Sequence, residues 1–300
     1  MKCYAAITAV IALVLSSLSA APAAAAPALW VVRGPGAEIY LFGTMHALTP
    51  ETQWRTPVYD AAYAKAATVW FEADLDGADP ASIQRLMEQY GFDPDRTISQ
   101  KLSPRQLARL RPILAQGRTP LSRIDHLRPW AAALMLSMQP MLAKGAQMQS
   151  GADATITHAA KAEAKQLRVF ETLEDQVRIF AGLSEPAEVG YLADVISERA
   201  AHARPAPRRQ ASREPGLEAS WLAGDMARFG PGVVGAMAKD TPEFYDRLVR
   251  QRNLSWADVL TREMAAGGTE LVNVGALHMV GPEGLPALMQ ARGFTVERLQ

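Results

Sequence analysis

One local pattern occurs twice in this chain, near its two ends, and it limits how the chain can fold. In each copy an apolar strand ends in glycine, and a histidine follows three residues later: Gly43 with His46, and Gly275 with His278. Glycine at a strand exit permits a close backbone approach, so the turn can direct the next side chains over the sheet edge. If the two strands are neighbours, both histidines meet at one site.

Predicted strands come from distant parts of the chain. They cover residues 29–33 and 38–42 (a hairpin), 68–73, 167–170, 269–274 and 293–299. A helix is predicted over 50–67, and most of residues 80–266 has helical periodicity. We therefore predict an α/β fold that leans towards α+β. Its small central mixed sheet is built from N- and C-terminal segments and is covered by a large helical insertion at about 80–266.

The first 26 residues have the pattern of a signal peptide. Lys2 precedes an apolar run at 5–18, and small residues at 19–26 offer several cleavage positions. The run is short for a transmembrane helix. We predict export across the inner membrane to the periplasm, with an uncleaved N-terminal anchor as the alternative. Residues 27–300 then form a single domain with a flexible Pro/Arg loop at about 203–216.

Composition excludes several classes of function. Cys3, the only cysteine, lies in the predicted signal peptide, so disulfides, thiolate ligands and a cysteine nucleophile are not expected. The formal net charge is zero, which gives no reason to expect nucleic acid as a partner. No later segment is apolar enough for a stable membrane span. The expected partner is a peptide or small-molecule substrate, and the oligomeric state stays open.

A third side chain joins the two histidines as a candidate ligand. Glu72 ends a strand whose neighbours predict burial, and a buried carboxylate is costly unless it is paired or binds a metal. Two imidazoles and one carboxylate are a recurrent ligand set for a catalytic divalent metal, which lowers the pKa of bound water. The alternative for Glu72 is a solvated carboxylate, or one paired with Arg33 or Arg128.

Other residues are candidates for supporting roles. Arg252, next to Asn253, could hold a carboxylate or steady an oxyanion, although a surface arginine is the alternative. Glu171 follows a short strand and could act as a further catalytic or supporting carboxylate. Gly281 and Gly284 are expected to shape the turn after His278 and to present backbone N–H groups to the site. The remaining histidines are assigned to surface or packing roles: His126, His158 and His202.

These motifs together resemble the TraB/PrgY/GumN family, over about residues 29–299. The likeness rests on Gly43-Thr-Met-His46, Phe71-Glu72-Ala-Asp74, Arg128-Pro129-Trp130, Gly151-Ala-Asp153, Phe170-Glu171-Thr172, Gln176, Arg252-Asn253 and the run from Gly275 to Leu285. Phe170 stands where leucine is more usual in the family. The resemblance implies a fold related to the erythromycin-esterase and haem-binding ChaN-like group, and kinship with the Tiki metalloproteases.

What this resemblance implies is an exported, peptidase-like, metal-dependent hydrolase. Carried over residue by residue, the metal ligands are His46, Glu72 and His278, and the metal is manganese or cobalt rather than zinc. Glu72 or Glu171 is the candidate general base, with Arg252 and Asn253 supporting substrate or transition state. The alternative is a non-catalytic envelope protein that binds haem or a peptide and serves polysaccharide or signalling functions. A structural envelope protein with a vestigial motif is a third reading.

Overall fold

The computed structural model describes residues 26–74, 79–202 and 216–300. All but the last residue of the predicted signal peptide, and all but the last residue of the predicted loop at 203–216, lie outside these ranges. Within them a mixed sheet of six strands has the order β4-β3-β5-β2-β1-β6. Its strands are β1 (Leu29–Gly34), β2 (Ala37–Thr44), β3 (Thr68–Phe71), β4 (Gln166–Val169), β5 (Gly268–Gly275) and β6 (Thr295–Arg298).

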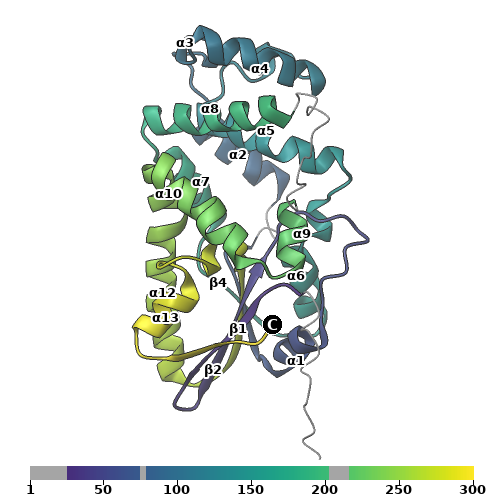
Figure 1. The fold of residues 1–300 in the computed structure, drawn as a ribbon, viewed down its shortest axis with the longest axis vertical. Coiled ribbons are helices and arrows are strands. Elements are labelled where there is room, and N and C mark those ends of the chain that lie inside the picture. Colours follow the sequence, from purple (N-terminus) through teal and green to yellow (C-terminus); the bar gives the residue numbers. More distant parts are fainter. Residues whose placement is uncertain (1–25, 75–78, 203–215) are drawn as a thin grey trace, which may run out of the picture.

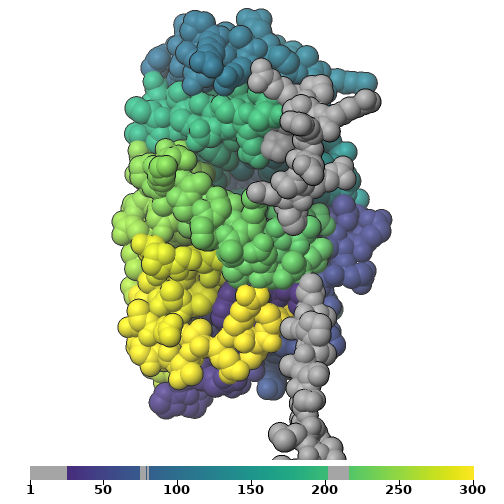
Figure 2. Space-filling view, in the orientation of Figure 1, coloured from purple at the N-terminus to yellow at the C-terminus, as the bar shows by residue number. Residues whose placement is uncertain are grey.

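The two ends of the chain meet in the middle of this sheet. Strands β2 and β5 are parallel neighbours although more than 200 residues separate them, and β3 and β4 continue the sheet in parallel on the far side of β5. On the other side β1 pairs antiparallel with both β2 and β6. The purple N-terminal and yellow C-terminal segments accordingly lie together at one end of the molecule in Figure 2. The predicted α/β fold is confirmed.

Helices surround and extend the sheet. They are α1 (Pro57–Lys65), α2 (Pro80–Tyr90), α3 (Ile98–Lys101), α4 (Pro104–Gln116), α5 (Pro129–Ala143), α6 (Ala152–Ala162), α7 (Leu173–Ala181), α8 (Glu185–His202), α9 (Leu217–Leu222), α10 (Gly235–Asp240), α11 (Pro242–Tyr245), α12 (Gln251–Ala266) and α13 (Leu285–Ala291). Short 3-10 or π turns are η1 (Leu121–Arg123), η2 (Met148–Ser150), η3 (Arg228–Val234), η4 (Asp246–Arg250) and η5 (Ala276–Met279). None of the helices in the described ranges is long and apolar enough to cross a membrane.

Alternation along the strands divides the core into two layers. In β2, Tyr40 and Phe42 join a cluster with α1, α6 and α9, whereas Ile39 and Leu41 join a cluster with α12 and α13. Successive side chains point to opposite faces of a sheet, so a strand buried on both sides reads as a continuous apolar run. Figure 1 shows α12 and α13 on one side of the sheet, and α1, α6 and α9 on the other.

The helical insertion forms a lobe above the sheet. A separate apolar cluster joins α3, α4, α5 and α8, with Ile124 and Leu136 fully buried in it. In Figure 1 this lobe lies beyond the end of the sheet, while β4, from the middle of the insertion, returns to the sheet edge. The lobe therefore faces the sheet end at which the parallel strands finish.

The helix predicted over 50–67 was too long at its N-terminal end. Helix α1 begins only at Pro57, and the side chain of Thr56 accepts a hydrogen bond from the Tyr59 N–H as its cap. Proline suits the first helical position because the N–H it lacks has no partner there. Upstream of the helix, Trp54 lies in chain without regular secondary structure and packs against Phe42, with 5.4 Å between the ring centroids. The predicted first turns of this helix are therefore absent, and the segment before Pro57 is held by aromatic packing instead.

Candidate functional site

The candidate residues lie where three parallel strands end side by side. Strand register pairs Thr44 with Gly275, and Phe71 with Asn273, so β2, β5 and β3 finish at the same sheet edge. The segments that follow these strands therefore start next to one another. Sites in open α/β sheets form outside the carboxyl ends of strands, and this one follows that rule.

His46, Glu72 and His278 converge beside Gly275. A Cβ atom placed on this glycine would lie 3.2 Å from Glu72 Oε1, 3.5 Å from His46 Nε2 and 3.8 Å from His278 Cδ2. The Gly275 N–H also donates to Glu72 Oε1 at 2.7 Å. The structure thus brings the three predicted ligands to one point, and it is the missing side chain of Gly275 that leaves room for them.

Gly275→Ala is expected to reduce ligand binding and activity at this site by at least about tenfold, with little loss of stability. The Gly275 φ of −51° suits alanine, so the effect comes from crowding Glu72 Oε1 rather than from backbone strain. Gly190→Ala, whose Cβ would have no neighbour within 4 Å, is the matched control. Thermal unfolding and divalent-metal titration of both variants test this. Unchanged metal binding in Gly275→Ala would contradict it.

Each histidine ring is held through its Nδ1 atom. His278 Nδ1 lies 2.6 Å from Asn253 Oδ1, and His46 Nδ1 lies 2.9 Å from Asp153 Oδ2. In a neutral imidazole an oxygen acceptor at Nδ1 favours the Nδ1–H tautomer and puts the lone pair on Nε2, the arrangement that is usual in metal-binding histidines. Thr44 Oγ1 steadies Asp153 by donating to its other carboxylate oxygen at 2.6 Å.

The two histidines differ in exposure and in electrostatic surroundings. His278 is 4% exposed, and burial together with the nearby Arg252 cation lowers its pKa to about 3. The His46 side chain is 48% exposed, and the Asp153 carboxylate raises its pKa to about 9. His46 is therefore the member of the pair that a ligand from solvent meets first.

Arg252 lies at the centre of the site. Its side chain is 8% exposed, so the surface alternative was wrong. It donates to Glu72 Oε2 at 2.6 Å, to both Glu171 oxygens at 2.8 and 2.9 Å, and to His278 Nε2 at 3.0 Å. Glu171, which the sequence analysis gave as a catalytic or supporting carboxylate, thus lies at the site and holds Arg252. The expected alternatives for Glu72 also fail, because Arg33 pairs with Glu38 and Arg128 with Glu188.

Pairing between the buried groups Glu72 and Arg252 keeps both of them ionised. Burial alone would raise the pKa of Glu72, but Arg252, His278 and His46 outweigh burial and hold this pKa well below its usual range. Burial disfavours the Arg252 cation, yet Glu72 and Glu171 raise its pKa above the usual value. A buried ion pair of this kind is strongly destabilised by loss of one partner.

Asn253 and the glycines after His278 build the turn itself. Asn253 Nδ2 donates to the carbonyl oxygens of His278 at 3.2 Å and Glu283 at 2.6 Å. Gly281 has a φ of +81°, which favours glycine, and the Gly284 N–H donates to the Gly281 carbonyl at 3.1 Å. The N–H of Gly284 is therefore used within the turn, contrary to the expectation that it faces the site.

Gly43 has a packing role. A Cβ on Gly43 would lie 3.0 Å from Ala276 Cα, so the missing side chain lets β2 approach η5 closely. Its carbonyl accepts a hydrogen bond from Trp221 Nε1 at 2.7 Å. The close approach at Gly43 thus places the segment that leads to His46 against the segment that leads to His278.

Sequence reasoning gave no role to two side chains at the site. Asp153, in the first turn of α6, holds His46, and Gln176 in α7 donates to Glu72 Oε2 at 3.2 Å. Neither follows a strand-end glycine, and both lie about 100 residues from their partners. The one signal was their place among the motifs that carried the family resemblance.

Asp153→Asn is expected to lower activity and metal affinity by about 10–100-fold, because the amide holds the His46 ring less strongly and removes its negative partner. Mutation of the hydrogen-bond partner of a metal-binding histidine typically lowers metal affinity or activity by this amount. Asp175→Asn, which affects a carboxylate that caps α7 through Thr172, controls for a general effect of losing a helix N-terminal charge. Isothermal titration with Mn²⁺ or Co²⁺ measures the difference, and equal affinities in the two variants would contradict the prediction.

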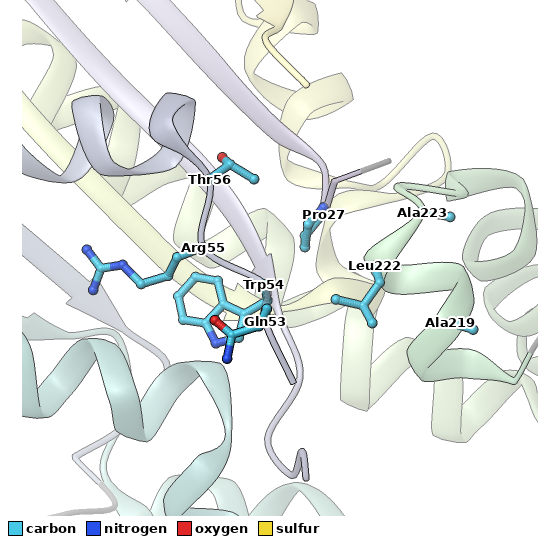
Figure 3. A pocket seen from close by; sticks show the side chains of 8 residues that line it. All are labelled: Pro27, Gln53, Trp54, Arg55, Thr56, Ala219, Leu222 and Ala223. Atoms are coloured by element: carbon cyan, nitrogen blue, oxygen red, sulfur yellow. The ribbon is translucent and has the colours of Figure 1, made fainter. Parts of the chain in front are cut away.

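The other histidines and one surface pocket lie apart from this site. His126 and His158 are exposed, as expected, and the side chain of His202 is outside the description. A pocket of about 390 Å³ lies between the loop at 53–56 and helix α9 (Figure 3). It is lined by none of the candidate residues.

Arg252 contacts two of the three predicted ligands, Glu72 and His278. Within the described parts of the chain, no three His, Asp or Glu side chains stand in ready coordination geometry. His278 Nε2 and Glu72 Oε1 are 3.8 Å apart, whereas ligands at about 2.1 Å from a shared tetrahedral ion are about 3.4 Å apart. Shared coordination by these two atoms requires that they move closer together by a few tenths of an ångström and that Arg252 Nη1 leaves His278 Nε2.

Comparison with known proteins agrees with the motifs. The TraB/PrgY/gumN family matches residues 28–298. The uncharacterized protein YbaP of Escherichia coli K12 is 25% identical over 193 residues, which cover 64% of this chain and 68% of YbaP, and YbaP of Shigella flexneri gives the same values. No solved structure matches the chain. Because the family match spans both G-x-x-H turns and everything between them, this chain belongs to the TraB/PrgY/gumN family.

Proposed function

We propose that this protein is a metal-dependent hydrolase of the peptidase type. The observation that carries the proposal is the convergence of His46, Glu72 and His278 beside Gly275, with Asp153 and Asn253 at the two Nδ1 atoms. Two imidazole nitrogens and a carboxylate with oriented outer partners are characteristic of catalytic divalent-metal sites. A ligand set without thiolates suits manganese and cobalt, and the preference for these metals over zinc rests on the family resemblance.

The residues of this chain have distinct roles in such a reaction. A bound divalent ion would lower the pKa of a water molecule and polarise a substrate carbonyl. Glu72 and the two histidines would hold that ion. Arg252, fixed by Glu171, would stabilise negative charge that develops on the carbonyl oxygen through its own positive charge and through the Nη1–H that contacts His278. Arg252 donates to both carboxylates, and Glu72 also accepts from Gln176 and from the Gly275 N–H, so Glu72 and Glu171 both remain candidates for accepting a proton.

Charged surroundings favour an ion over haem as the ligand. Haem needs a broad apolar cleft, whereas the space between His46 and His278 is lined by Glu72 and Arg252. Both imidazoles also approach one narrow point beside Gly275. Export to the periplasm remains part of the proposal and rests on the N-terminal sequence pattern.

Cleavage of a peptide library by residues 27–300, with Mn²⁺ or Co²⁺ and then with a chelator, tests the proposal. We expect cleavage that needs the metal and is lost in His278→Ala. No cleavage and no metal binding would reject it and favour a binding protein. Cleavage that survives complete chelation would reject the metal. N-terminal sequencing of the periplasmic protein tests export and signal cleavage.

A further inference from the structure

We propose that Arg252 is a built-in counter-ion that occupies the cation position of this site in the metal-free protein and is displaced from His278 when a metal binds. The inference rests on the proposed function, because it concerns the same ligands. It assigns to Arg252 a regulatory role, competition with the metal, in addition to support of the substrate.

The contacts of the guanidinium are those of a cation among ligands. Nη2 donates to Glu72 Oε2 at 2.6 Å, and Nη1 donates to His278 Nε2 at 3.0 Å. Because His278 Nδ1 faces Asn253 Oδ1, Nε2 carries the lone pair, and Arg252 uses it. A metal and Arg252 Nη1 therefore compete for the same lone pair.

The rest of the side chain is anchored away from that lone pair. Nε and Nη2 reach the two oxygens of Glu171, and Nη1 has a second acceptor in the Leu248 carbonyl at 3.0 Å. The guanidinium also lies over the Trp256 ring, with 4.5 Å between Cζ and the ring centroid. Release of His278 thus costs Arg252 one of several contacts, and the side chain stays beside the site.

Whether metal affinity rises or falls when Arg252 is removed distinguishes competition with the metal from support of its ligands. If Arg252 only orients Glu72 and His278, removing it should weaken metal binding. If it competes, removing it frees the His278 lone pair, leaves two carboxylates without a counter-cation and removes repulsion of the metal, so binding should tighten. Charges a few ångströms apart in a buried site interact strongly enough for an effect of about tenfold or more.

Metal affinity of Arg252→Met, Arg252→Lys and wild type, measured for Co²⁺ and Mn²⁺ by competition with a fluorescent chelator, tests this. We expect about tenfold or greater tightening in Arg252→Met and a smaller change in Arg252→Lys, which keeps the charge. Arg178→Met, on the exposed face of α7, is the matched control and should bind as wild type does. Equal or weaker binding in Arg252→Met would overturn the proposal.

A second measurement covers the case in which Arg252→Met does not fold. In ¹⁵N spectra of wild type, the diamagnetic probe Zn²⁺ should shift the His278 Nε2 signal, while the Arg252 Nε signal, held by Glu171, changes little. An unchanged Arg252–His278 contact in the Zn²⁺-bound state would overturn the proposal. The two proposals fail differently. Metal binding by Arg252→Met but not by wild type would reject the metal-dependent function and support competition between Arg252 and the metal. Metal binding by neither would reject both.

Discussion

Replacing His278 by alanine is expected to abolish stoichiometric metal uptake and to lower any hydrolytic activity by more than about 100-fold, the upper range for losing an outer partner of a ligand. His278 is 4% exposed, and its two ring nitrogens contact Asn253 and Arg252. The change therefore removes a proposed ligand, the donor to Asn253 Oδ1 and one of the acceptors of Arg252 Nη1. Elemental analysis of protein purified in Mn²⁺ or Co²⁺ measures metal content directly.

A second histidine variant separates ligand loss from unfolding. His278→Ala opens a buried cavity, which costs about 2–4 kcal/mol of stability by comparison with other large-to-small core changes. His46→Ala removes a ligand whose side chain is 48% exposed, so we expect the same loss of metal with a smaller loss of stability. His126→Ala changes an exposed histidine outside the site and should keep full metal content. Full metal occupancy in either ligand variant would contradict the proposed centre.

Gly151→Ala is expected to destabilise the protein by about 3 kcal/mol or more and to disable the site. A Cβ at this position would overlap the carbonyl group of His46, with its carbon only 2.6 Å away. The overlap is with backbone, which cannot rotate aside as a side chain can. The Ala152 N–H also donates to the Met45 carbonyl at 2.9 Å, so α6 and the His46 turn are joined at this point.

The same clash would displace Asp153 from His46, because Asp153 lies in the turn that follows Gly151. Gly151 has a φ of −57° and a ψ of 152°, which alanine adopts easily. The expected destabilisation therefore comes from steric overlap and not from backbone strain. Chemical unfolding measures the stability change, with Gly190→Ala in α8 as the control. That control should be neutral or slightly stabilising, because a Cβ there is unopposed. A Gly151→Ala protein as stable as the control would contradict the close approach.

Much of the sheet was predictable because strand periodicity is a local property. The hairpin, the buried strand before Glu72 and the strand before Gly275 all have apolar runs bounded by turn residues, and each appears within about two residues of its expected place. The start of α1 was predicted too early, because Trp54 lies before the helix and packs against Phe42. Aromatic packing depends on residues far along the chain and has no periodic signal.

The sequence by itself determined that two G-x-x-H turns and a buried glutamate exist, and it indicated that they belong together if their strands are neighbours. Only the tertiary structure decided that β2, β5 and β3 are adjacent and end in register. It also decided that Arg252, rather than solvent or a surface arginine, neutralises Glu72, and that Asp153 holds His46. These contacts join residues about 100 to 230 positions apart, and pairing at such separations is fixed by the packing of the whole chain, which no local spacing encodes.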